Sequence, residues 1–193
     1  MPPLCAQYGA GVRLAQRPAG LIILPGAGGG RDNRTLLALE AGLTPVDDDG
    51  GAAHPAAPPL RVVRAEFANR TAGKSGPERP AIAVAHVHTL GTQLAADLGV
   101  PTTQIVVGGR SFGGRMASIA VAEGLEVAGL LLLSYPLHPP GKPETLRIAH
   151  LAAITTPVLA VSGEKDPFGT PAELREHLAV IPPQPEPHGG RSQ

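Results

Sequence analysis

The chain has 193 residues with 16 Lys or Arg and 16 Asp or Glu, so its formal net charge is zero and no basic stripe favours nucleic acid as a partner. The length suits one domain with a substantial core, expected over residues 1–193. The apolar runs are too short to cross a membrane and the first residues lack a secretory pattern, so we expect a cytoplasmic protein. Cys5 is the only cysteine, so we expect no disulfide within the chain.

Apolar runs alternate with helical segments along the chain. Buried strands are predicted at 21–24, 61–67, 104–108, 127–133 and 156–162. Helices are predicted at 34–41 after a cap at Asp32 or Asn33, at 80–98, at 114–123 and at 171–180 after a capping box at Thr170. Strands that are apolar throughout and alternate with helices predict a mostly parallel sheet covered on both faces, a three-layer α/β fold.

Two Pro- and Gly-rich segments interrupt this pattern. Residues 45–59 hold acids, small residues, prolines and one histidine, and we predict a flexible loop there. Residues 181–193 contain four prolines, which an ordinary ladder strand does not accept, so the last strand of the sheet is expected to be missing. The strand at 156–162 would then be an unpaired edge, and such an edge predicts a homodimer formed through it.

Residues 109–113 read Gly-Arg-Ser-Phe-Gly and follow an apolar, β-branched run. This is G-x-S-x-G at a strand-to-helix turn, the arrangement called a nucleophile elbow. Ser111 is therefore the predicted nucleophile, and the N–H of Phe112 would face a developing oxyanion. Ala27, in the glycine-rich loop after the first apolar strand, is predicted to supply the second N–H.

That glycine-rich loop does not indicate a nucleotide cofactor. A dinucleotide fingerprint starting at Gly26 would need a glycine where Arg31 stands, and no phosphate-loop lysine is suitably placed. His86 and His88 face different directions on a helix because they are two residues apart, so they predict no metal site. We expect neither a cofactor nor a metal.

The acid and the base of a triad should follow the serine in chain order. Asp166 comes directly after the predicted strand 156–162 and is the candidate acid, with Glu164 as the alternative. Two histidines follow Asp166. His188, in the Pro-rich tail, is the predicted base, and His177, in a predicted helix, is the alternative.

The segment 135–143 leaves a buried strand at the same edge of the predicted sheet. It is stiffened by four prolines and carries Tyr135, Leu137 and His138. We predict that these three residues line the substrate pocket beside Ser111.

Three stretches, 108–115, 134–143 and 163–169, together resemble the dienelactone-hydrolase-related branch of the α/β-hydrolase superfamily. The resemblance implies that Ser111 is the nucleophile, Asp166 the acid, and Ala27 and Phe112 the oxyanion donors. The chain departs from the family pattern in two places. Pro25-Gly26 stands where relatives have His-Gly, and the Pro-rich tail stands where they have a last strand followed by a Gly-Asp-His-like turn.

Two functions follow from these patterns. One is a serine hydrolase that acts on a small ester, thioester or lactone through a Ser-His-Asp triad and an acyl-enzyme. The other is a non-catalytic, hydrolase-like scaffold that binds a ligand or partner, which the unusual tail favours. Labelling of Ser111 by a fluorophosphonate distinguishes them.

Overall fold

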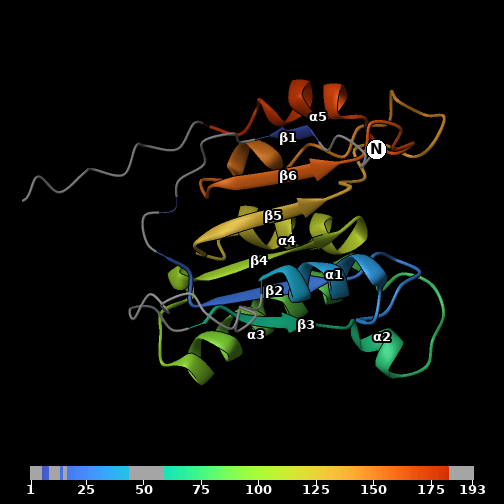
Figure 1. Cartoon of the computed structure of the whole chain (residues 1–193). Helices are drawn as coiled ribbons and strands as arrows, with labels where there is room; N and C mark the ends of the chain where they lie inside the picture. The colour runs from blue at the N-terminus through green and yellow to red at the C-terminus, as the bar shows by residue number, and fades with distance from the viewer. Residues whose placement is uncertain (1–5, 9–13, 15–16, 44–58, 183–193) are drawn as a thin grey trace, which may run out of the picture.

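A computed structural model describes residues 6–8, 14, 17–43 and 59–182. Within these residues one sheet forms the centre, with the strand order β1-β6-β5-β4-β2-β3 (Figure 1). The strands are β1 (Ala6–Tyr8), β2 (Gly20–Leu24), β3 (Arg61–Arg64), β4 (Ile105–Arg110), β5 (Gly129–Leu133) and β6 (Val158–Ser162). From β2 to β6 all pairings are parallel, which confirms the predicted parallel sheet.

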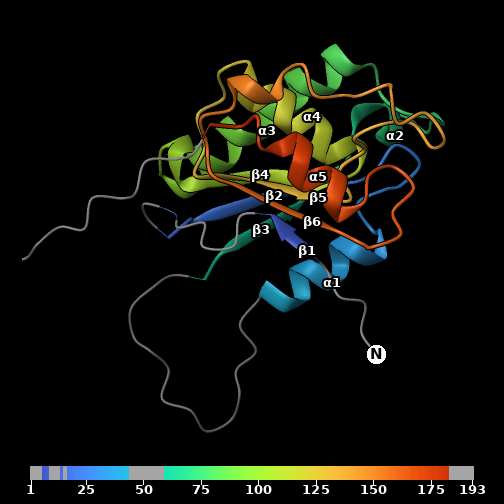
Figure 2. The same ribbon diagram turned by 90° about the horizontal axis from the view of Figure 1, so that it is seen from above.

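Helices cover both faces of the sheet. The α-helices are α1 (Arg34–Leu43), α2 (Ala68–Thr71), α3 (Pro80–Leu98), α4 (Phe112–Ala122) and α5 (Pro171–Leu178), and the short 3-10 helices are η1 (Thr102–Gln104) and η2 (Leu151–Ala153). Figure 2 shows α1 on one face and α3, α4 and α5 on the other. The predicted three-layer α/β architecture is therefore present.

The alternation of side chains along β2, which lies between β4 and β3, explains why both faces of the sheet need a cover. All five of its residues are buried. Ile22 and Leu24 belong to the larger core, which packs against α3 and α4. Leu21 and Ile23 point to the other face and form a smaller core with Leu36 of α1. Successive side chains of a strand point to opposite faces, so a strand buried on both faces is apolar throughout.

Local signals place the helix ends close to their predicted positions. Pro80 opens α3, and Gly99 ends it in the left-handed conformation at φ 65°. The capping box of α5 is present, with the Thr170 N–H donating to Glu173 Oε2 at 2.8 Å. The largest shift in a helix start is that of α4, which begins at Phe112 rather than Gly114, because Ser111 is already its N-cap residue.

The prediction that the strand at 156–162 is an unpaired edge is wrong. β1 pairs antiparallel with β6, from Ala6 opposite Ser162 to Tyr8 opposite Ala160. The described sheet therefore ends in β1 and β3 rather than in β6. β1 has only three residues, too few for a periodic pattern to be recognised in sequence. The homodimer predicted through the β6 edge has thereby lost its structural basis.

Two of the predictions fall on segments whose structure is not described. The segment 45–59 lies outside the described residues except for Pro59, and so does the tail beyond Pro182, which contains His188. In the described part of the chain, no helix is both long enough and apolar enough to span a membrane.

Candidate active site

Ser111 occupies a sharp turn between β4 and α4, with φ 49° and ψ −115°. A positive φ is uncommon for a residue with a side chain, and such strain gathers at functional sites. The turn is fixed on both sides of the serine. Its N–H donates to Leu133 O at 2.8 Å, and its carbonyl accepts from the Arg115 N–H at 3.0 Å. The structure therefore has the backbone geometry that the G-x-S-x-G pattern predicts.

The two glycines of the pattern are required by close packing against β2. A Cβ at Gly109 would collide with the backbone of Leu24. A Cβ at Gly113 would lie 2.6 Å from both Leu24 O and Pro25 O. Backbone atoms cannot move aside as a flexible side-chain end can, so only glycine lets β4 and α4 approach β2 this closely.

Of the two predicted oxyanion donors, Phe112 directly follows the serine and Ala27 belongs to the glycine-rich loop after β2. The Phe112 N–H is the first of α4, where backbone donors have no partner inside the helix and the helix dipole favours negative charge. The glycine-rich loop lies against the elbow, since a Cβ at Gly26 would be 3.5 Å from Ser111 Cβ. Neither the Phe112 nor the Ala27 N–H donates to another described residue.

A cavity of about 590 Å³ contains both Ser111 and the predicted acid. Its walls are formed by Arg110, Ser111, Ser134, Gly163, Glu164, Lys165, Asp166, Pro167 and Phe168. The Asp166 carboxylate is held by its own loop: Oδ1 accepts from the Phe168 N–H at 3.0 Å, and Oδ2 lies 3.4 Å from Ser162 Oγ. Asp166 is half-buried, whereas Glu164 is exposed.

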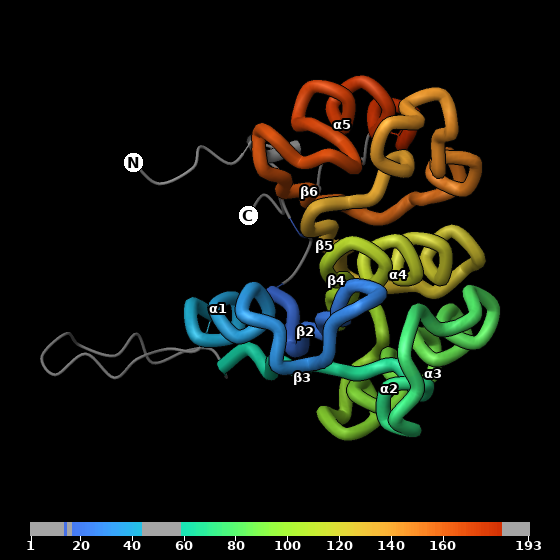
Figure 3. The backbone as a smooth tube through the Cα atoms, turned by 90° about the vertical axis from the view of Figure 1, so that its right-hand side faces the viewer, coloured from blue at the N-terminus to red at the C-terminus, as the bar shows by residue number. Residues whose placement is uncertain are grey.

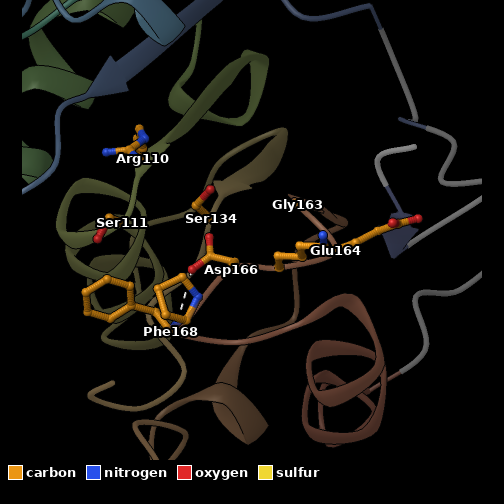
Figure 4. A pocket seen from close by; sticks show the side chains of 9 residues that line it. Arg110, Ser111, Ser134, Gly163, Glu164, Asp166 and Phe168 are labelled. Atoms are coloured by element: carbon orange, nitrogen blue, oxygen red, sulfur yellow. Dashed lines mark hydrogen bonds between the residues drawn. The ribbon is translucent and has the colours of Figure 1, made fainter. Parts of the chain in front are cut away.

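Three neighbouring strands bring these groups to one edge of the sheet. Ser111 follows β4, Ser134 follows β5, and Asp166 lies in the loop after β6. Figure 3 faces the carboxyl ends of the strands, where these connections gather. Figure 4 shows Ser111, Ser134 and Asp166 around the same pocket. Ser134 also has a positive φ, 48°, and its N–H donates to Val161 O at 2.8 Å. The sequence analysis did not assign Ser134 to the site, although the family-like stretch 134–143 begins with it.

Tyr135, Leu137 and His138 do not line this cavity, in contrast to their predicted place. All three are buried. The Tyr135 O–H donates to Arg147 O at 2.8 Å, and burial raises the pKa of this phenol to about 12. The His138 N–H donates to Phe168 O at 3.1 Å. The segment therefore supports the loop that carries Asp166.

The structure describes five histidines, and none of them lines the cavity: His86, His88, His138, His150 and His177. His177, the alternative base, is in the last turn of α5. His188, the predicted base, lies outside the described residues. The described residues therefore bring the predicted nucleophile and acid to one cavity, but they place no histidine in its lining.

Away from the cavity, a buried serine contacts a half-buried histidine. Ser118 Oγ is 2.7 Å from His150 Nε2. Ser118 has no exposed surface and its hydroxyl also donates to Arg115 O at 2.8 Å, so a substrate cannot reach it. Burial, with the charge of Arg115, lowers the pKa of His150 to about 4, which keeps the ring neutral. The contact between Ser118 and His150 links α4 to the residue that precedes η2.

The fold and the elbow define a hydrolase-type α/β protein, and the family comparison agrees. A family model described as an alpha/beta hydrolase domain matches residues 18–184, so the chain belongs to the α/β-hydrolase family. No match was found among curated proteins.

Two solved structures illustrate the similarity. One, titled "AbyA5 Wildtype", is 14% identical with a TM-score of 0.49, and the match covers 92% of this chain and 59% of that one. The other, titled "Bacterial Heroin Esterase", is 16% identical with a TM-score of 0.41, and the match covers 95% of this chain and 51% of that one. The chain thus spans little more than half the length of these structures.

Proposed function

We propose that this protein is a serine hydrolase that cleaves a carboxylic ester, thioester or lactone through an acyl-enzyme on Ser111. The observation that carries the proposal is the strained Ser111 turn, which opens into the same cavity as Asp166. The motifs around Ser111, Ser134 and Asp166 support the dienelactone-hydrolase-related branch within the family.

The proposed reaction has two halves. Ser111 Oγ attacks the carbonyl carbon while its proton passes to a base, and the oxyanion accepts hydrogen bonds from the Phe112 and Ala27 N–H groups. The carbon–oxygen or carbon–sulfur bond then breaks, and the base returns the proton to the leaving group. In the second half, the base takes a proton from a water molecule whose oxygen attacks the acyl carbon. The bond from that carbon to Ser111 Oγ then breaks, the base returns the proton to Ser111 Oγ, and the acid is released.

A base is needed between Ser111 and Asp166. Their strands, β4 and β6, are separated by β5, and neighbouring strands are about 4.8 Å apart, so the two strand ends are roughly 10 Å apart. That gap is too wide for a direct hydrogen bond but suits an imidazole bonded on one side to the serine and on the other to the carboxylate. We propose His188 for this place, above Ser134.

The alternative function, a hydrolase-like binding scaffold, is favoured by one observation. None of the histidines that the structure describes reaches the cavity. If residues 183–193 do not deliver His188, the cavity would bind a carbonyl compound without turning it over.

Labelling of the full chain with a fluorophosphonate probe tests the proposal. We expect a covalent adduct on Ser111, none in Ser111→Ala, and an undiminished adduct in the matched control Ser118→Ala, because Ser118 is buried. Hydrolysis of p-nitrophenyl acetate should fall at least about 10³-fold in Ser111→Ala.

The base is tested by a second pair of variants. Hydrolysis of p-nitrophenyl acetate by His188→Ala should fall as far as that by Ser111→Ala, and His177→Ala should hydrolyse the ester at the wild-type rate. A wild-type chain that neither labels nor hydrolyses would favour the scaffold. Full activity in Ser111→Ala would end the serine-hydrolase proposal, and full activity in His188→Ala would assign the base elsewhere.

A further inference from the structure

Arg110 places a cation directly beside the nucleophile. It is the last residue of β4, it lines the cavity next to Ser111, and it is half-buried. The point that a Gly26 Cβ would occupy lies 3.6 Å from Arg110 Nη1 and 3.5 Å from Ser111 Cβ. The guanidinium therefore lies against the glycine-rich loop that carries the predicted oxyanion donor Ala27.

Arg110 forms no ion pair with any residue that the structure describes. The ion pairs among those residues join Arg64 to Asp32 and Glu40, and His138 to Glu173. Arg110 takes part in none of them. Of the two carboxylates at the cavity, Asp166 is held by its own loop, and Glu164 extends away from Ser111 on the far side (Figure 4).

We propose that Arg110 binds a carboxylate of the substrate, so that the preferred substrates are esters with a carboxylate a few atoms from the scissile carbonyl. This inference rests on the proposed function. A guanidinium presents paired N–H donors that match a carboxylate, and partial burial strengthens such a charge-assisted pair. Asp166 and Glu164 would repel the second negative charge of a phosphate monoester, so one negative charge suits the cavity better than two.

Lys165 is the other cation at the cavity, but it fits this role less well. It is exposed, and it belongs to the acid loop rather than to the elbow. An exposed ammonium on a flexible stem interacts weakly with an anion in water. Arg110 is fixed next to Ser111 by the chain itself.

The kinetic test compares two esters of nearly equal shape. Monomethyl succinate carries a carboxylate where methyl butanoate carries a methyl group, and acid release is followed with a pH indicator. In Arg110→Met we expect kcat/KM for monomethyl succinate to fall about 10- to 100-fold, the range for loss of a charge-assisted hydrogen bond, and kcat/KM for methyl butanoate to change less than about 3-fold.

Arg61→Met is the matched control, because Arg61 is exposed at the start of β3, far from the carboxyl edge of the sheet. It should leave both rates unchanged. An equal fall for both esters in Arg110→Met, or no fall for either, would overturn the inference.

A binding measurement tests the inference without turnover. Titration calorimetry of monomethyl succinate into the full chain carrying Ser111→Ala should show binding, and adding Arg110→Met should weaken it at least about 10-fold. Absence of binding, or equal binding by both proteins, would overturn the inference. Fluorophosphonate labelling of wild-type Ser111 reports separately on the proposed function, so the failure of one can be told from the failure of the other.

Discussion

The strain at the elbow makes an unusual prediction about stability. Ser111 is held at φ 49° and ψ −115°, a region that glycine enters readily and that costs a residue with a Cβ about 1–3 kcal/mol. Ser111→Ala keeps the Cβ and the strain, whereas Ser111→Gly removes both. Glycine also raises the entropy of the unfolded chain, which costs about 0.5–1 kcal/mol. Ser111→Gly should therefore be more stable than Ser111→Ala by up to about 2 kcal/mol.

The assay is equilibrium urea unfolding of the two variants, both of which lack the hydroxyl. A difference of 1 kcal/mol corresponds to about 2–4 °C in Tm for a domain of this size, so a thermal scan gives a second reading. Ser118 supplies a matched control, because it lies in the interior of α4. There Gly should be less stable than Ala by about 1 kcal/mol, the opposite sign. If Ser111→Gly is the less stable of its pair, the strain argument is refuted.

Three further predictions concern the packing around the site. Gly113→Ala should lose about 1–3 kcal/mol in urea unfolding because its Cβ would meet the backbone of β2, whereas Gly42→Ala in α1, where the new Cβ meets nothing within 4 Å, should lose nothing. Burial and a neighbouring guanidinium lower the pKa of His150 from 6.5 to about 4, so protonation of this ring favours the unfolded state. The free energy of unfolding should therefore fall by about 1 kcal/mol, for a partly exposed ring, as the pH drops from 6.5 towards 4. His150→Gln should remove that part of the pH dependence. Thr170→Ala should lose about 1 kcal/mol with the cap of α5, and Thr170→Ser should keep most of it, as measured by Tm.

The elbow was predictable from sequence because its cause is local. Gly109 and Gly113 lie two residues on either side of Ser111, and the apolar run before them fixes a strand. The glycines are needed at those positions because β4 and α4 both press on the backbone of β2. The place of Asp166 at the same cavity as Ser111 followed from chain order and from the buried strand before it. The capping box of α5 was predictable for the same reason, since all of its atoms belong to residues 170–173.

The loop after β5 was not predictable in this way, because its contacts are made with a distant part of the chain. Tyr135, Leu137 and His138 are apolar or amphipathic, which suits a pocket wall and a core equally well. Their burial depends on the loop at 163–169, where Phe168 O accepts from the His138 N–H and a Cβ at Gly169 would lie 3.0 Å from Leu137 Cβ. The order of residues within 135–143 therefore could not predict that contact.

The sheet positions Ser111, Ser134 and Asp166, but it does not supply the proposed base. Strands β4, β5 and β6 are mutual neighbours, and their hydrogen bonds fix the spacing of Ser111, Ser134 and Asp166. The close packing of Gly109 and Gly113 on Leu24 and Pro25 fixes the turn at Ser111 against β2. In the proposed mechanism the base is His188, which lies outside the described part of the chain, and the prolines of 183–188 could not donate ladder hydrogen bonds to hold that segment. Binding of an ester carboxylate by Arg110 would therefore be independent of the tail, whereas turnover would depend on it.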